Sequence, residues 1–455
     1  MNDTLSSRIA HWSAGFGMQD LPPPAIALVK RAYLDTLAVT LLGARLDGPR
    51  IVAGIERARG AAPVASIHGM GGKTDLLSAA LINGTSAHAE LFDDNSVPMI
   101  AHPSSPLVSA LLPLAQAHNL PGRTLVEAYG VGFEVGVALG RAANPALYEK
   151  GWHVTRVLGV IGATAACCRL LGLAPERTVA ALGIAATLAS GLRQNFGTMT
   201  MGLHVGLTAR DAVHATLLAQ AGMSADGAAL DGKYGLFPTF STGAIAPVDV
   251  GRPLELMASG ITFKPYPSGA PTHAAVDAAL ALRARPGFDP GQVRRIACLV
   301  HPWNAMTLRE EEPRDALQAR VNMRYCIAAA LRYGELTFRQ FDDSLVDDPA
   351  LRDLMRTIAI EVADDLPDNG EFPAELRVET RDGKVWAERR DVPPGGSSRP
   401  LADRDIVAKF RSCAGVSLPA ATAERVIGMV LDLENLACAA SLCELLEGRP
   451  GGEQT

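Results

Sequence analysis

Long hydrophobic runs, concentrated basic charge and an export signal are all missing from this sequence. The chain has 455 residues, and no apolar run reaches the roughly 18 residues that a membrane span needs. Its 42 Lys and Arg are outnumbered by 48 Asp and Glu and do not cluster, whereas nucleic-acid binding requires a concentrated basic face. The first residues lack the basic and apolar regions of a signal peptide, so we expect a cytoplasmic protein. From the hydropathy and the charge distribution, we expect neither a membrane nor a nucleic-acid partner.

Cysteine pairs and the common catalytic signatures are missing as well. The seven cysteines form no C-x-x-C pair, so in a cytoplasmic protein we expect reduced, buried thiols rather than disulfides or an iron–sulfur cluster. No H-E-x-x-H, G-x-x-x-x-G-K-[ST] or G-x-S-x-G motif occurs, which argues against a zinc protease, a P-loop protein and an α/β-hydrolase. The glycines at 130–140 lack the strand–turn–helix context of a dinucleotide site.

The sequence does contain helical periodicity from its start to about residue 250. Apolar side chains recur at helical spacing after the prolines at 22–24. Glycines at 130, 132 and 136 would weaken an isolated helix, so they predict close helix–helix approach in a buried bundle. Aromatic residues make up only 5% of the chain, which fits a tightly packed core of small aliphatic side chains.

The pattern changes near Gly260. Alternating apolar and polar residues then predict three strands, at 294–300, 358–362 and 374–380. The pair Asp382-Gly383 predicts a hairpin after the third strand, and helical spacing returns near residue 401. We therefore predict a mainly α fold: a large all-helical domain formed by both chain ends, 1–258 and 401–448, a smaller inserted α+β domain, 259–400, and a disordered tail, 449–455.

Two histidines and two aspartates gather in the segment from His88 to His102. One interpretation is a loop that leaves the helical bundle and presents His102 to a cavity, with Asp93, Asp94 and Asn95 beside it. The alternative is that the aspartates cap a helix or turn and that His102 lies in a proline turn. No thiolate or third histidine follows at the spacing of zinc ligands, so we expect no metal there.

Two further polar segments lie at helix ends. His153 opens an apolar helix, where the helix dipole disfavours imidazolium, so it would suit a general base or a hydrogen-bond donor to a carboxylate. A capping or packing role fits that position equally well. Arg193 and the backbone amides near Thr198 could clamp a carboxylate. The alternative is a solvated helix C-terminus, with Arg193 interacting with the helix dipole.

A fourth polar segment lies at the change from the helical to the alternating pattern. It contains Lys264 and Tyr266 within a proline-stiffened loop, followed by His273 in the first turn of the next helix. Ligand sites often form where domains meet, so the segment could be an active-site wall. A structural hinge is the alternative.

The motifs occur in this order: Asn83-Gly84, Phe92-Asp93-Asp94, His102-Pro103-Ser104, Gly151-Trp152-His153, Gly191-Leu192-Arg193-Gln194, Gly197-Thr198-Met199-Thr200, Phe263-Lys264-Pro265-Tyr266-Pro267 and Thr272-His273. Together, over nearly the whole chain, they resemble the MmgE/PrpD family, which includes 2-methylcitrate dehydratases, cis-aconitate decarboxylases and an iminodisuccinate epimerase. The resemblance implies a homodimer whose histidine-rich active site lies between the helical and the inserted domain. It also implies a small di- or tricarboxylate substrate and no metal or organic cofactor.

The resemblance further implies roles for single residues. Three histidines would be catalytic: His102, His153 and His273. The substrate would be bound by Asp93, Asp94, Asn95, Arg193, Thr198, Met201, Lys264 and Tyr266.

The chain departs from the family pattern at two of these segments. Where the family usually has Asp-Phe-Asp-Asp-Thr, this sequence begins with Leu91 and ends with Asn95, and the lysine of Gly-Thr-Met-Thr-Lys is replaced by Met201. The loss of one acid and one base leaves the formal charge unchanged. It does remove a cation whose bond to a substrate carboxylate would contribute roughly 1.5–3 kcal/mol. A tricarboxylate substrate is therefore less favoured.

We expect a cofactor-independent lyase, similar to 2-methylcitrate dehydratase, that uses histidine acid–base chemistry at a carbon next to a carboxylate. The alternatives are an epimerase of a small dicarboxylate or imino acid, a cis-aconitate-type decarboxylase, and a degenerate paralogue that binds a carboxylate without turnover. His102 and His153 are the expected acid–base pair, with His273 binding the substrate or sharing that role. The sequence does not decide which of the pair is the acid.

Overall fold

A computed structural model describes residues 4–241, 245–307, 311–396 and 398–448. The predicted disordered tail, 449–455, lies outside the described residues. The fold is mainly helical, as predicted, and the described strands form one four-stranded and one two-stranded sheet; the two-stranded sheet lies within residues 1–258, which were expected to be all-helical. The chain divides into two compact units: a helical unit made of Met1–Ala89, Asp93–Ile261 and Ala402–Thr455, and a mixed unit made of Glu90–Phe92 and Thr262–Leu401.

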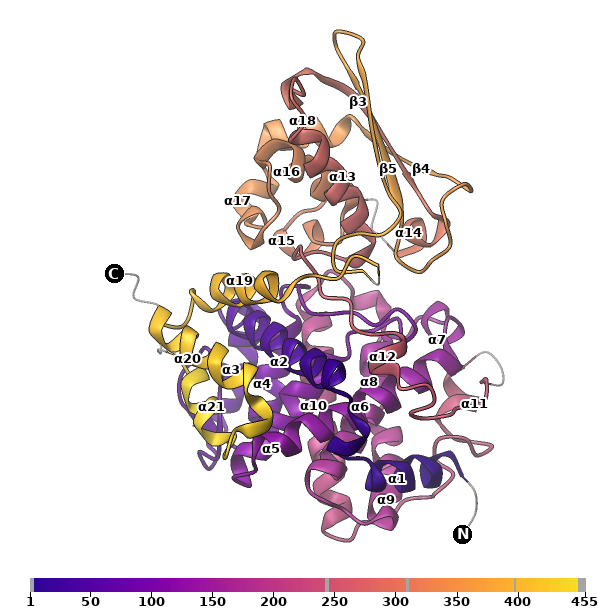
Figure 1. The fold of residues 1–455 in the computed structure, drawn as a ribbon, viewed down its shortest axis with the longest axis vertical. Helices are drawn as coiled ribbons and strands as arrows, with labels where there is room; N and C mark the ends of the chain where they lie inside the picture. The colour runs from indigo at the N-terminus through magenta and orange to yellow at the C-terminus, as the bar shows by residue number, and fades with distance from the viewer. Residues whose placement is uncertain (1–3, 242–244, 308–310, 397, 449–455) are drawn as a thin grey trace. The chain divides into compact units, whose positions relative to one another are not determined.

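The helical unit draws its helices from both ends of the chain (Figure 1). Helix α19, from the C-terminal part of the chain, packs against α2, and a buried ion pair joins Lys409 to Asp35 at 2.7 Å. The helices of this unit are α1 (Leu5–Gly15), α2 (Pro23–Gly43), α3 (Asp47–Ala58), α4 (Leu76–His88), α5 (Ser104–Ala117), α6 (Gly122–Ala143), α7 (Ala146–Glu149), α8 (Val154–Leu170), α9 (Pro175–Leu188), α10 (Met199–Gln220), α11 (Leu236–Phe240), α12 (Glu255–Ala258), α19 (Asp403–Ala414), α20 (Ala420–Leu431) and α21 (Ala440–Leu446). Strands β1 (Ala65–Ser66) and β2 (Lys73–Thr74) pair as a short antiparallel ladder.

Glycines let the central helices approach closely. A Cβ atom on Gly84 of α4 would lie 2.8 Å from the Cα atom of Gly206 in α10. A Cβ atom on Gly162 of α8 would lie 2.7 Å from the carbonyl oxygen of Gly132 in α6. Real Cβ contacts are longer than this, so a larger residue would push the helices apart. The predicted use of glycine for close packing is confirmed, because these contacts set α4 against α10 and α8 against α6.

The mixed unit is built on a four-stranded sheet of order β4-β3-β5-β6. Strands β3 and β4 are parallel, whereas β5 pairs antiparallel with β3 and β6. The predicted strands and the hairpin at Asp382-Gly383 are confirmed. Helices α13 and α16 bury their alanine-rich faces in one core with β3 and β5. The elements are α13 (His273–Arg283), β3 (Val293–Val300), α14 (Pro302–Thr307), α15 (Ala316–Ala319), α16 (Met323–Tyr333), α17 (Asp343–Val346), α18 (Pro349–Arg356), β4 (Ile358–Val362), β5 (Ala374–Thr380) and β6 (Val385–Arg390).

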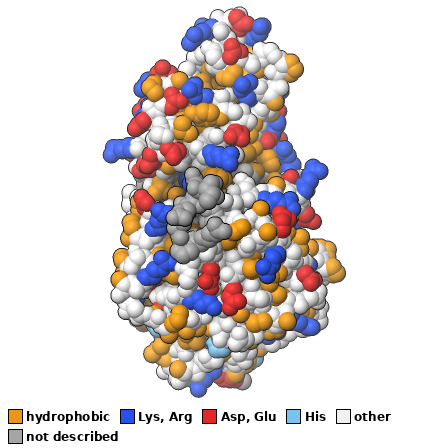
Figure 2. Space-filling model, turned by 90° about the vertical axis from the view of Figure 1, so that its left-hand side faces the viewer, with side chains coloured by type: hydrophobic (Ala, Val, Ile, Leu, Met, Phe, Trp, Pro, Cys, Tyr) orange, Lys and Arg blue, Asp and Glu red, His pale blue; other side chains and the backbone are white. Residues whose placement is uncertain are grey.

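Three expectations from composition can be compared with the structure. All seven cysteines are free, and six are buried, the exception being the half-buried Cys438. None of the helices in the described part of the chain combines the length and apolarity needed to cross a membrane. Basic and acidic side chains are interspersed on the face seen in Figure 2, in keeping with the unclustered charge of the sequence.

Candidate active site

Four histidines of the helical unit form one cluster, called here the imidazole cluster. His88 is the last residue of α4, His102 lies in the loop before α5, His153 is the N-cap of α8, and His204 lies near the start of α10. The ring centroids of His88 and His102 are 4.6 Å apart, those of His88 and His153 are 5.7 Å apart, and those of His153 and His204 are 5.2 Å apart. Three helix ends and one loop therefore bring four titratable rings together.

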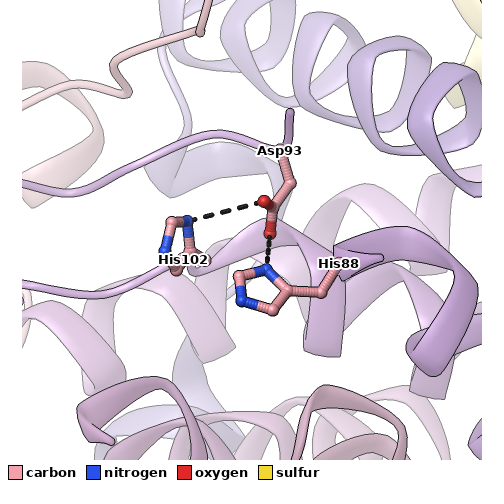
Figure 3. Close-up of side chains that lie close together, drawn as sticks. All are labelled: His88, Asp93 and His102. Carbon is pink, nitrogen blue, oxygen red and sulfur yellow. Dashed lines mark hydrogen bonds and ion pairs between the residues drawn. The ribbon is translucent and has the colours of Figure 1, made fainter. Parts of the chain in front are cut away.

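Asp93 connects two rings of the cluster (Figure 3). Its carboxylate accepts a hydrogen bond from His88 Nδ1 at 2.9 Å and lies 3.6 Å from His102 Nδ1. Ser105 at the start of α5 also donates to the same carboxylate, at 2.8 Å. Because a carboxylate oxygen favours the donating form of a neighbouring nitrogen, Asp93 keeps a hydrogen on His88 Nδ1. His88 Nε2 is then a bare acceptor, and it has no hydrogen-bond partner among the described residues.

His102 has its two ring nitrogens in different surroundings. Its Nδ1 donates to the carbonyl oxygen of Asp94 at 2.7 Å. A carbonyl oxygen only accepts, so this contact assigns the hydrogen of the neutral ring to Nδ1 and leaves Nε2 with a lone pair. The side chain is 19% exposed, the most of the cluster, and its backbone N–H is held by Thr155 Oγ1 at 3.1 Å. His102 thus has the geometry of a general base.

His153 and His204 are bonded to each other. Their Nδ1 atoms lie 3.0 Å apart, and both rings are buried. The ring of Phe196 meets His153 edge-on, with centroids 5.0 Å apart. An antiparallel bridge between Trp152 and Leu192 holds the backbone next to His153. The positions of both rings are therefore fixed by the surrounding backbone.

Burial keeps these rings neutral. It lowers the pKa of His153 well below its ordinary value, and the charges that His88, His204 and His102 would carry lower it further. Burial, followed by the charges of His88 and Arg156, lowers the pKa of His204 to about 4. Burial also raises the pKa of Asp94 to about 8, although hydrogen bonds from Ser104 oppose that shift. At neutral pH, the rings of His153 and His204 are therefore uncharged.

Comparison with known proteins identifies the family of the chain. The profile of the MmgE/PrpD N-terminal domain matches residues 7–248, and that of the MmgE/PrpD C-terminal domain matches residues 266–435. The chain belongs to the MmgE/PrpD family. The expected membership is confirmed.

Several relatives in this family carry the same name. A cis-aconitate decarboxylase of Homo sapiens is 28% identical over 448 residues, which cover 95% of this chain and 92% of the relative. A cis-aconitate decarboxylase of Aspergillus terreus is 26% identical over 473 residues, covering 97% and 96%. A cis-aconitate decarboxylase-like protein of Aspergillus oryzae is 27% identical over 470 residues, covering 98% and 97%. These relatives confirm that this MmgE/PrpD protein is an enzyme of the lyase type.

The acidic residues expected to bind substrate are buried. Asp93 holds His88, as described, and Asp94 accepts hydrogen bonds from the backbone N–H of Ser104, at 3.2 Å, and from its hydroxyl. Both carboxylates therefore contact protein groups and position the loop that carries His102. Asn95 is half-buried, and its amide nitrogen has no hydrogen-bond partner among the described residues. Asn95 is thus the member of this segment with an unused donor.

The segment before α10 is tied to its own neighbours. The guanidinium of Arg193 lies 3.7 Å from the centre of the Tyr148 ring and donates to the Tyr148 carbonyl oxygen at 2.9 Å. Thr198, the N-cap of α10, donates its hydroxyl hydrogen to the Asn195 carbonyl oxygen at 2.8 Å. Met201 is buried, with 4% of its surface exposed, one helical turn before His204. It therefore fills space on the same face of α10 as the cluster histidine.

The remaining predicted residues belong to the mixed unit. Lys264 Nζ donates to the carbonyl oxygen of Leu91 at 2.8 Å. Tyr266 meets the ring of His273 edge-on, with centroids 5.5 Å apart, and His273 Nε2 donates to the Ser268 carbonyl oxygen at 3.2 Å. Tyr266 and His273 are thus brought together. Leu91 has a φ of 52°, in the left-handed region that costs a branched L-residue about 1 kcal/mol.

Sequence reasoning gave no role to two members of the cluster, His88 and His204. The partner of His204 is distant in the sequence, because His204 bonds His153, 51 residues away. The available signal was helical spacing, because Met201 and His204 are three residues apart and therefore share one face of α10. His88 was visible as a helix-terminal histidine, but its bond to Asp93 depends on the turn that ends α4.

Three of these residues could also form a metal site by donor type. His88, Asp93 and His102 offer ligand atoms that all lie within 4.8 Å of one another. Two imidazoles and a carboxylate are a donor set for iron(II) or zinc. The local spacing that argued against a metal did not anticipate this arrangement. In the structure, however, the Nδ1 atoms of His88 and His102 both lie at hydrogen-bond distance from oxygen atoms, so a metal bound at either Nδ1 would replace a hydrogen bond.

Proposed function

We propose that the protein is a lyase for a small di- or tricarboxylate, whose chemical step moves a proton at a carbon next to a carboxylate. The observation that carries this proposal is the bond from His102 Nδ1 to the Asp94 carbonyl oxygen. It leaves Nε2 of a part-exposed ring as the proton acceptor. The lyase class is supported by relatives named cis-aconitate decarboxylase that match over almost the full chain.

Proton transfer by His102 can accompany either the loss of water or the loss of CO2. In a dehydration, His102 Nε2 takes the proton, the electron pair forms the new double bond, and hydroxide leaves with a proton from a second group. In a decarboxylation, the carbon–carbon bond breaks and CO2 leaves. The electron pair then shifts through the double bond to a carbon next to another carboxylate, which accepts a proton from His102 Nε2 after that nitrogen has taken one from solvent. Both routes pass through charge spread over a carboxylate, which fixed donors must stabilise.

The relatives favour loss of CO2 over loss of water as the first reaction to test. The apolar Met201, buried on the cluster face of α10, favours a substrate with fewer charges than a tricarboxylate. The same residue supports a second candidate function, the epimerisation of a small dicarboxylate or imino acid, in which a base removes and returns one α-proton.

We also propose a homodimer, which analytical ultracentrifugation tests.

The test is a substrate panel followed by proton NMR and by CO2 detection. It contains unsaturated, hydroxy- and imino-dicarboxylates together with cis-aconitate and 2-methylcitrate. Release of CO2 with a shortened unsaturated product supports the decarboxylase, and an alkene without CO2 supports the dehydratase. Inversion of one centre supports the epimerase. Binding of a carboxylate with no product and no proton exchange over the whole panel would overturn the lyase proposal.

A further inference from the structure

The contact between His153 and His204 requires the two rings to differ. Their Nδ1 atoms are 3.0 Å apart, which is hydrogen-bond distance. Two bare nitrogens would repel at that distance, and two N–H groups would clash. One neutral ring must therefore carry its hydrogen on Nδ1 and the other must accept with a bare Nδ1. It follows that one Nε2 atom of the pair is a donor and the other is an acceptor.

The backbone of both residues is held in place, and the ring of His153 packs edge-on against Phe196, which restricts its rotation. His153 N donates to the Gly191 carbonyl oxygen at 3.0 Å, and a Cβ atom on Gly191 would lie 3.6 Å from His153 Cβ. His204 lies in α10, whose Gly202 and Gly206 pack against α4 with almost no spare room. Both side chains are more than nine-tenths buried. Water is therefore a poor substitute for the partner ring at either Nδ1.

We propose that His204 is a positioning residue: its Nδ1 determines which nitrogen of His153 carries the hydrogen, and so whether His153 Nε2 is a donor to the reacting carboxylate or a bare acceptor. The catalytic role of His204 rests on the proposed function, whereas the tautomer of His153 follows from the contact between the two rings. His204 differs in this respect from Asp94, whose carbonyl oxygen sets the tautomer of His102. The site then has two rings whose hydrogens are assigned by separate partners.

Two variants of His204 separate hydrogen bonding from packing. His204→Asn keeps a polar group near the position of Nδ1, whereas His204→Leu fills similar space and offers neither donor nor acceptor. We expect kcat of His204→Leu to fall about 100-fold with KM changed less than about threefold, and His204→Asn to recover most of the loss. A matched control is His68→Asn, since His68 is a buried histidine near β1 with a similarly lowered pKa.

The structural half of the proposal is read by long-range ¹H–¹⁵N NMR on protein labelled at histidine. We expect one Nδ1–H and one Nε2–H ring within the pair, assigned from His153→Gln and His204→Leu, and altered His153 nitrogen shifts in His204→Leu but not in His68→Asn. The same tautomer on both rings, or unchanged His153 shifts in His204→Leu, would overturn the proposal. Equal losses of kcat in His204→Leu and His204→Asn would overturn the catalytic role. If no substrate is turned over, the NMR result still decides the tautomer.

Discussion

The Nδ1 atom of His102 lies 2.7 Å from the carbonyl oxygen of Asp94, and this contact gives the two nitrogens of the ring separate tasks. The carbonyl oxygen can only accept, so Nδ1 is committed to donation. Nε2 is the nitrogen to which we assign the proposed proton exchange with a substrate. Asp94 lies only eight residues before His102, and both belong to the loop that joins α4 to α5. A local backbone conformation thus prepares the base before any substrate binds.

Asp93 is expected to support catalysis without contacting substrate. Asp93→Asn should lower kcat more than it raises KM, because the amide no longer favours a hydrogen on His88 Nδ1, 2.9 Å away. The unfolding free energy should fall by about 1–3 kcal/mol, the cost of disturbing a buried hydrogen-bonded group. Steady-state kinetics and urea denaturation measure the two effects. Ser105→Ala, which removes only the hydroxyl donor to Asp93, is the control, and equal kcat values for the two variants would contradict this account.

Asp94 is expected to make stability depend on pH. Its pKa is raised from 3.8 to about 8 in the folded protein, so the folded state keeps a proton that the unfolded chain loses. This contribution is complete below about pH 4 and disappears as the pH rises towards 8. The unfolding free energy of the wild type minus that of Asp94→Asn should therefore fall over this range, by at most about 1.4 kcal/mol per pH unit. Parallel curves from urea titrations at pH 4–8 would exclude the shift.

His68 is expected to make the unfolding free energy depend on pH in the opposite direction to Asp94. Burial lowers its pKa from 6.5 to about 4, so the unfolded chain binds a proton that the folded protein does not. Its contribution is complete above pH 6.5 and is lost as the pH falls towards 4. The unfolding free energy of the wild type minus that of His68→Asn should therefore rise with pH between 4 and 6.5 and then level off. A difference that falls over that interval would contradict the buried neutral ring.

Met201 is expected to limit the charge of the substrate. Met201→Lys should lower the KM for tricarboxylates by about 10- to 100-fold, since a charge-assisted bond contributes roughly 1.5–3 kcal/mol. Because Met201 is buried, the new charge should also lower the unfolding free energy. Met201→Gln has a similar shape without the charge and should show neither the gain nor the full destabilisation. Unchanged tricarboxylate affinity in Met201→Lys would mean that residue 201 does not face the substrate.

Metal removal is expected to leave activity unchanged. The family resemblance implies no metal, and the Nδ1 atoms of His88 and His102 already contact oxygen atoms, although these histidines and Asp93 have suitable ligand atoms. Dialysis against a chelator, with metal content measured by mass spectrometry, tests this expectation. A stoichiometric metal whose removal abolishes activity, with recovery on its return, would replace the hydrogen-bonded arrangement by a metal centre.

Local sequence signals predicted many of the helices and strands, because periodicity and turn chemistry depend on neighbouring residues. The strand at 374–380 and the Asp382-Gly383 turn depend on alternation and turn chemistry, which neighbouring residues determine. The glycine of α6 that approaches α8, Gly132, was also recognisable, because glycine within an apolar helix has few other uses. These features need no knowledge of distant parts of the chain.

The arrangement of the site depended on contacts that the sequence does not display. The order of motifs identified His102 and His153, but the bond from His153 to His204 joins residues 51 apart, on different helices. The tautomer of His102 depends on a backbone carbonyl oxygen, which has no residue-type signature. The left-handed backbone of Leu91 was equally hidden, since leucine rarely adopts it.

The central claim is proton transfer by His102, and solvent deuterium measures it most directly. The enzyme is incubated in D2O with the carboxylate that the panel identifies, and deuterium next to a carboxylate is followed by proton NMR for wild type, His102→Gln and His68→Asn. We predict deuterium at that carbon in wild type and His68→Asn, and a rate at least about 100-fold lower in His102→Gln with substrate affinity retained. Incorporation by His102→Gln at the wild-type rate would contradict the account.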